Sequence, residues 1–175
     1  GTTKTIGKLG QALSFNGSSD HVILSSEYSL ESSDSSFVAW IQNRGNVGDD
    51  TIIEQANAVR SAGWDFFVNS NLVNFIYASS VDSIGLTGTQ DLSDEGWHHI
   101  VVTVTISNGV GMLYEDGVLT DTDTFIGSLQ HRFQIPAIGS TEDNGNFFNG
   151  SLDDIRIYKR ALLSTEVTDM YNVGR

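Results

Sequence analysis

The chain has 175 residues, of which 39% are hydrophobic and 10% aromatic, and we expect one domain spanning residues 1–175. Nine basic residues against 22 acidic ones give a net charge of −13, which disfavours nucleic acid and anionic membranes as partners. There is no cysteine and no apolar run of membrane-spanning length, so disulfides and membrane insertion are excluded. Without an initiator methionine or signal peptide, the chain is expected to be a mature or excised piece of a longer protein.

Short segments that alternate apolar and polar residues follow one another, separated by clusters of Gly, Asn, Asp and Ser. The expected strands cover residues 13–15, 21–24, 36–42, 51–55, 64–69, 72–78, 97–106, 110–118, 133–139 and 147–158. Tight turns are expected at Ser70-Asn71 and Asp116-Gly117. This succession predicts an all-β fold of two packed antiparallel sheets.

A single short helix is expected at the end of the chain, in the stretch STEVTDMY. Ser164 is a suitable N-cap, and Val167, Met170 and Tyr171 lie on one helical face. We therefore expect this face to pack against the sandwich.

Two aspartates stand in phase with apolar strand positions, Asp20 before Val22 and Asp153 before Ile155. A carboxylate on a buried strand face is unfavourable unless it is paired. If both carboxylates point at one core edge, calcium could bridge them, with oxygens from the Asn16-Gly17 turn completing its shell. We therefore predict a structural calcium with Asp20, Asp153, Asn16 and Gly17 as ligands. In the alternative, Asp20 caps a turn and Asp153 bonds backbone amides or Arg156.

The expected hairpin over residues 64–78 offers a candidate ligand-binding surface. If its alternate apolar residues face inward, Asp65, Phe67, Asn74 and Ile76 face outward together. An aromatic ring beside an amide and a carboxylate suits a sugar, because the ring covers C–H faces while the polar groups bind hydroxyls. In the alternative, a loop such as Ser79–Asp91 covers Phe67 and Ile76.

Three further residues are candidates for the ligand-binding site. His99 is in phase with Val101 and Thr103 and is expected to line an open sheet face, whereas His98 is expected to be a hydrogen-bonded core histidine. His131 and Arg132 lie in the basic and aromatic segment QHRF and are expected to rim a site.

No catalytic array is evident in the sequence. Retaining glycoside hydrolysis requires two carboxylates about 5 Å apart, as alternate residues on one strand provide. The pairs Glu115-Asp116 and Glu142-Asp143 are adjacent, so their side chains diverge or lie in turns. His98 and His99 project to opposite strand faces and cannot bind one metal together. We therefore predict that the domain is not an enzyme.

The blocks KLGQALSFNGSSDHVIL, SSFVAWIQ, GWHHIVVTV, LYEDGVL and FFNGSLDDIRIYKRALLSTEV resemble bacterial laminin-G-like members of the concanavalin A-like lectin/glucanase superfamily. The resemblance spans nearly the whole chain and implies a jelly-roll sandwich, in many members with a structural calcium. Glu115 departs from the pattern, because an apolar residue is expected before Asp116-Gly117.

Members of this family are usually non-catalytic modules of secreted enzymes, adhesins and surface proteins. The resemblance and the outward-facing residues together predict a carbohydrate-binding module that binds a polysaccharide or oligosaccharide. We expect it to be a monomeric module of a larger secreted or cell-surface protein. The alternatives are a protein-interaction or adhesion domain and, less favoured by the residues, a diverged glycan hydrolase.

Overall fold

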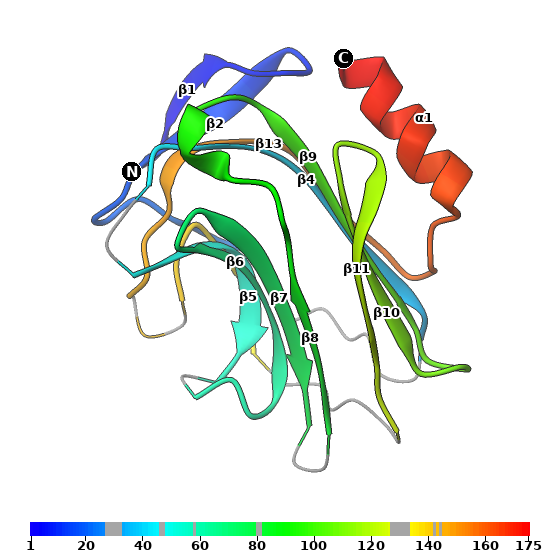
Figure 1. The fold of residues 1–175 in the computed structure, drawn as a ribbon. Helices are drawn as coiled ribbons and strands as arrows, with labels where there is room; N and C mark the ends of the chain where they lie inside the picture. Colours follow the sequence, from blue (N-terminus) through cyan, green and yellow to red (C-terminus); the bar gives the residue numbers. More distant parts are fainter. Residues whose placement is uncertain are drawn as a thin grey trace.

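The computed structural model describes residues 1–26, 33–45, 48–57, 59–79, 82–126, 134–141, 143 and 145–175. Within these ranges, thirteen strands form two antiparallel sheets that face each other, and a single α-helix lies outside them (Figure 1). The predicted all-β sandwich with a C-terminal helix is confirmed.

The seven-stranded sheet has the order β1-β2-β13-β4-β9-β10-β11. Its strands are β1 (Thr3–Ile6), β2 (Gln11–Asn16), β13 (Asn149–Tyr158), β4 (Ser35–Asn43), β9 (His98–Thr105), β10 (Val110–Glu115) and β11 (Val118–Thr124). The six-stranded sheet has the order β3-β12-β5-β6-β7-β8. Its strands are β3 (Val22–Ile23), β12 (Ala137–Ile138), β5 (Asp49–Ala56), β6 (Gly63–Asn69), β7 (Leu72–Ala78) and β8 (Ser83–Thr87), and the helical elements are the 3₁₀ turn η1 (Leu92–Asp94) and α1 (Ser164–Gly174).

Both predicted tight turns are present. Ser70 and Asn71 join β6 to β7 with φ of 51° and 62°, and Asp116 and Gly117 join β10 to β11 with φ of 50° and 80°. Two consecutive residues with positive φ match the right-handed twist of the flanking strands, which favours short hairpins. The sequence missed β1 and β8 and merged β11 with the strand before it.

The core lies between the two sheets and is built from the side chains of each sheet that point toward the other sheet. Its largest fully buried side chains include Phe15, Phe37, Ile41, Ile52, Ile53, Trp64, Phe66, Phe75, Tyr77 and Phe148. Glu115 also points inward, opposite Ile100, yet it accepts hydrogen bonds from the backbone N–H groups of Thr89 and Gln90 at 2.8 and 3.3 Å. This unusual residue therefore anchors the segment that follows β8.

Helix α1 covers the outer side of the seven-stranded sheet (Figure 1). Val167 is fully buried against Val38, Val101 and Tyr114, with Met170 beside it, as predicted for this helical face. Ser164 is the first helical residue and not the N-cap, so that prediction is wrong by one position. Leu163 precedes the helix, and its N–H donates to Glu166 Oε2 at 2.8 Å. None of the described helices is long and apolar enough to cross a membrane.

Two aspartates of β11 join the edges of the two sheets. Asp121 Oδ2 accepts from the Thr87 N–H and Asp123 Oδ2 from the Gly85 N–H of β8, both at 2.8 Å. The other oxygen of each carboxylate accepts the N–H of the residue that follows it in β11. The two aspartates are two residues apart in β11, and the two amides are two residues apart in β8. The carboxylates therefore accept from successive outward-pointing N–H groups of β8, where a neighbouring strand would otherwise bind.

Candidate functional site

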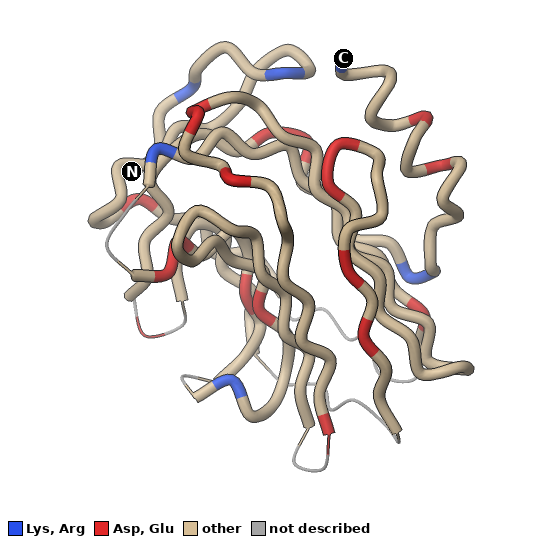
Figure 2. Tube along the Cα trace, in the orientation of Figure 1, with Lys and Arg blue, Asp and Glu red and all other residues tan. Residues whose placement is uncertain are grey.

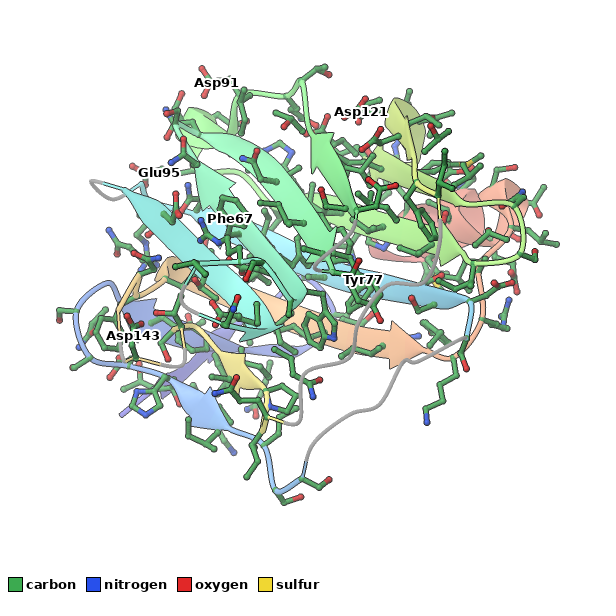
Figure 3. All side chains as sticks on the ribbon, turned by 90° about the horizontal axis from the view of Figure 1, so that it is seen from below. Phe67, Tyr77, Asp91, Glu95, Asp121 and Asp143 are labelled. Atoms are coloured by element: carbon green, nitrogen blue, oxygen red, sulfur yellow. The ribbon has the colours of Figure 1, made fainter. Side chains whose placement is uncertain are left out.

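Four of the seven predicted ligand-binding residues lie on the outer face of the six-stranded sheet, the side of β5, β6 and β7 that points away from the core. Asp65 pairs with Ile76 and Phe67 with Asn74 across β6 and β7, so the four share this face as expected. Strand β5 pairs with the other edge of β6. Its residue Glu54 lies opposite Asp65, and its residue Thr51 lies opposite Phe67, so both belong to the same face. Figure 3 shows Phe67 among these strands.

Arg60 is the residue that organises this face, and it comes from the loop between β5 and β6. Its Nε lies 2.5 Å from Asp65 Oδ2, and its Nη2 lies 2.7 Å from Asp49 Oδ2. The guanidinium carbon stands 4.1 Å from the centroid of the Phe67 ring, within the range of a cation–π contact. Arg60 is thus held by two carboxylates and an aromatic platform.

The loop that presents Arg60 is fixed by Asn57. The Asn57 side-chain oxygen accepts from the Ser61 and Ala62 N–H groups at 2.8 and 3.3 Å, and its backbone oxygen accepts the Arg60 N–H at 2.8 Å. Arg60 itself has φ of 51°, a conformation that non-glycine residues adopt only where the surroundings impose it. Strain of this kind is frequent at functional positions.

Asp65 is fully buried although it carries the charge that holds Arg60. Burial raises the pKa of its carboxyl to about 7, against the opposing effect of the Arg60 guanidinium. Its second oxygen, Oδ1, and the buried hydroxyl of Thr51 have no hydrogen-bond partner among the described residues. Buried polar atoms are nearly always hydrogen-bonded, so two unsatisfied ones on a single face are notable.

Two pairs of polar side chains at the rim of this face are bonded to one another. Asn69 Nδ2 donates to Asp49 Oδ1 at 2.6 Å, and Thr87 Oγ1 donates to Asn74 Oδ1 at 3.0 Å. Side chains at the rim are therefore preordered, and rigid polar groups are what a hydroxylated ligand requires.

Phe67 shares the outer face as predicted, but it is not available as an exposed stacking ring. It is only 5% exposed, because the guanidinium of Arg60 lies over it. The prediction of an open aromatic surface is wrong, and the alternative, in which Phe67 is covered, describes its burial, with Arg60 from the loop between β5 and β6 over the ring. Asn74 and Ile76 remain half-buried at positions that solvent reaches.

His99 does not line an open face, because α1 covers that side of the other sheet. It is 1% exposed, 4.9 Å from the Trp40 ring and 6.2 Å from the Tyr171 ring of α1. Neither ring nitrogen has a partner among the described residues, and burial lowers the pKa of His99 to about 4. Its neighbour His98 contacts Asp94 and Asp116 at 3.0 Å, as expected for a hydrogen-bonded histidine. His131 and Arg132 lie outside the described residues.

The four predicted calcium ligands do not converge into one donor set. Asn16 Oδ1 accepts three backbone N–H groups, from Ser18, Ser19 and Asp20, and Asp20 Oδ1 lies 3.0 Å from the Gly1 nitrogen. The two oxygens of Asp153 accept from the N–H groups of Leu9 and Asp154. Gly17 N–H donates to the Phe148 oxygen. In the part of the chain that the structure describes, no group of three or more His, Asp or Glu side chains could hold a metal ion.

The inward direction predicted for Asp153 is wrong, because a bulge interrupts β13. Asp153 pairs with Trp40 on the outer side of the sheet, the pairing with β4 resumes only at Arg156, and Asp154 has φ of 49°. A bulge adds one residue and reverses the side to which later residues point. The alternative, in which Asp153 bonds backbone amides, describes the observed contacts.

Sequence reasoning missed Arg60, Asp49, Thr51 and Glu54. A bulge between Thr51 and Ile53 breaks the alternation in β5, so its outward residues could not be assigned from period two. Arg60 gave one weak signal, as an isolated cation in a strongly acidic chain. Figure 2 shows how few basic residues accompany the acidic ones over both sheets.

The two packed antiparallel sheets define a β-sandwich domain. The sequence model of the concanavalin A-like lectin/glucanases superfamily matches residues 16–168, and the chain belongs to this family. No curated protein matches the chain significantly.

Among solved structures, the binding domain of Paraclostridial Mosquitocidal Protein 1 is similar, with a TM-score of 0.80 and 18% identity over 99% of this chain. Domain 4 of AbnA, an extracellular arabinanase from Geobacillus stearothermophilus solved with arabinotriose, is similar with a TM-score of 0.76 and 20% identity over 98% of this chain and 81% of its own. The botulinum neurotoxin serotype G binding domain has a TM-score of 0.71 and 16% identity over 99% of this chain. The chain spans 46% of both toxin structures, and at these identities the likeness shows the fold alone.

Proposed function

We propose that this chain is a non-catalytic glycan-binding module whose ligand lies on the outer face of the six-stranded sheet. The observation that carries the proposal is the group on this face: a guanidinium fixed over Phe67, with unsatisfied oxygens of Asp65 and Thr51 beside it. Sugar hydroxyls both donate and accept hydrogen bonds, so they complement such a mixture of donors and acceptors. The similar arabinanase domain was solved with arabinotriose, which supports a sugar as the ligand class.

On the other sheet, α1 packs over the outer side of β4, β9 and β10. Its outward residues Val38, Val101 and Tyr114 are buried in the cluster beneath the helix. The outer face of the six-stranded sheet is therefore the better place for a ligand. This assignment replaces the site that the sequence had divided between the two sheets.

A glycan array probed with the whole chain tests the function directly. Binding to one or more oligosaccharides, without release of reducing ends on prolonged incubation, is the expected result. Release of reducing ends would support a hydrolase instead, with Glu54 and Asp65 as the carboxylates that share a face on adjacent strands. Failure to bind any glycan, in protein shown to be folded, would refute the proposal.

We also propose that the protein is secreted and that it binds a structural calcium ion. The similar domain of AbnA comes from an extracellular arabinanase, which supports an extracellular setting. Calcium rests on the sequence and the family resemblance, since the contacts of Asp20, Asn16 and Asp153 do not fit a shared shell. Metal analysis of purified protein is the direct test.

A further inference from the structure

We propose that the guanidinium of Arg60, and not the ring of Phe67, contacts the ligand, and that this face binds neutral sugars in preference to acidic ones. The inference rests on the proposed function and specifies the ligand class for the same site. Phe67 is the platform that positions Arg60, and Asp65 and Asp49 hold its guanidinium in place.

Arg60 stays over Phe67 when ligand binds. Displacing it would leave the fully buried Asp65 without its cation, and breaking a buried ion pair on one side is strongly destabilising. The loop clamped by Asn57 also fixes the backbone from which the side chain extends. A sugar therefore meets the guanidinium, not the aromatic ring beneath it.

The free hydrogen-bonding groups define what the ligand must offer. The Arg60 guanidinium can only donate, so it requires an acceptor, and the Arg60 side chain is 24% exposed. The ionised form of Asp65 accepts at Oδ1 and so requires a donor, and the Thr51 hydroxyl can take either role. A sugar hydroxyl supplies both a donor and an acceptor within one small group.

Charge excludes the acidic alternative. A uronate carboxylate could accept from Arg60 but has no hydrogen to donate to Asp65, and it would meet Asp49, Asp65 and Glu54 on the same face. The Arg60 guanidinium is already shared between two carboxylates, and the whole chain carries a net charge of −13. Like charges brought together in a partly buried site are unfavourable.

Affinity electrophoresis tests this selection with five defined polymers. Arabinan, xylan and mannan are neutral, polygalacturonate is acidic, and chitosan is cationic; all are tested at high salt to suppress non-specific attraction. We expect retardation by at least one neutral polymer and none by polygalacturonate. Preferential retardation by polygalacturonate or by chitosan would overturn the selection argued here.

Variants then test the residue assignment by calorimetry with the neutral polymer that binds. Arg60→Lys should weaken binding at least tenfold, because lysine lacks the planar fork that Asp65 and Asp49 orient. Arg60→Gln with Asp65→Asn removes both charges of the buried pair, so the protein should fold and yet lose binding. Arg160→Gln, at an exposed ion pair with Glu166 beside α1, is the matched control and should bind like the parent.

Thr51→Val separates a ligand-binding role from a structural one. The substitution removes a buried hydroxyl that has no described partner and keeps the shape, so it should raise the melting temperature while weakening binding. A lower melting temperature with unchanged affinity would refute the role of Thr51. Parent-like affinity in both Arg60 variants would refute the inference and leave the glycan-binding function standing, whereas binding to none of these polymers and to no glycan on the array would refute both.

Discussion

His99 makes the docking of α1 sensitive to acid. The folded protein buries it neutral between Trp40 and Tyr171, with its pKa lowered by burial to about 4, whereas an unfolded chain titrates near 6.5. Between these values the unfolded state binds more protons than the folded state, so stability falls as pH falls. The loss is about 2 kcal/mol at pH 5 and about 3 kcal/mol once the pH is below 4.

The variant His99→Phe keeps an aromatic ring at this position and removes the titrating group. Urea melts of parent and variant at pH 7.5 and pH 5 give the four free energies needed. We expect the advantage of the variant to grow by about 2 kcal/mol at pH 5. Asp65, whose pKa is raised to about 7, titrates with the opposite sign, but it is present in both proteins and cancels in the comparison.

Val167→Ala is the matched control, because it weakens the same contact between α1 and the sheet without changing a titratable group. It should lower stability by the same amount at both pH values. If parent and His99→Phe lose equal stability between pH 7.5 and pH 5, the acid sensitivity does not come from His99.

Three further measurements bear on the fold and the predicted metal. Phe75→Ala and Phe67→Ala should each lose about 3–5 kcal/mol in denaturant melts, since both rings are buried; a near-neutral Phe67→Ala would mean that its ring is exposed after all. Replacing Asp121 and Asp123 by alanine should speed hydrogen exchange of the β8 amides measured by NMR, and unchanged protection would contradict the contacts between the sheet edges. If a structural calcium is present, EDTA should lower the melting temperature and Asp20→Ala should remove that effect, whereas metal-free protein with an unchanged melt would refute the prediction.

The sequence predicted the sandwich well because period-two alternation and turn residues carry most of the information about strands. The β6–β7 hairpin is an example: its alternation and the Ser70-Asn71 turn placed Asp65, Phe67, Asn74 and Ile76 on one face correctly. The side of the sheet to which a side chain points, however, does not determine whether solvent reaches it. Whether Phe67 is open depends on where Arg60 reaches, and no local pattern contains that information.

The errors in the site share a physical cause. Bulges in β5 and β13 each interrupt the alternation by one residue. In β5 the outward direction of Thr51 and Glu54 could therefore not be predicted, and in β13 Asp153 was predicted to point inward although it points outward. His99 was misjudged for another reason, because helix and strand are far apart in sequence and the cover that α1 provides is a tertiary contact. Contacts between segments far apart in sequence determine which outward-facing residues are buried, and the alternation of apolar and polar residues does not show this.

The aspartates of β11 also decide where this sandwich can recruit another strand. With the outward amides of β8 occupied by Asp121 and Asp123, that side presents negative charge and no free donors to a neighbouring chain. At the opposite end of the larger sheet, β1 pairs with β2 alone among the described strands, and its last residue, Ile6, is 87% exposed. Strand-by-strand assembly, whether with a partner peptide or in aggregation, is therefore favoured at β1 over the side formed by β8 and β11, and Lys4 is the charged residue of β1 that opposes it.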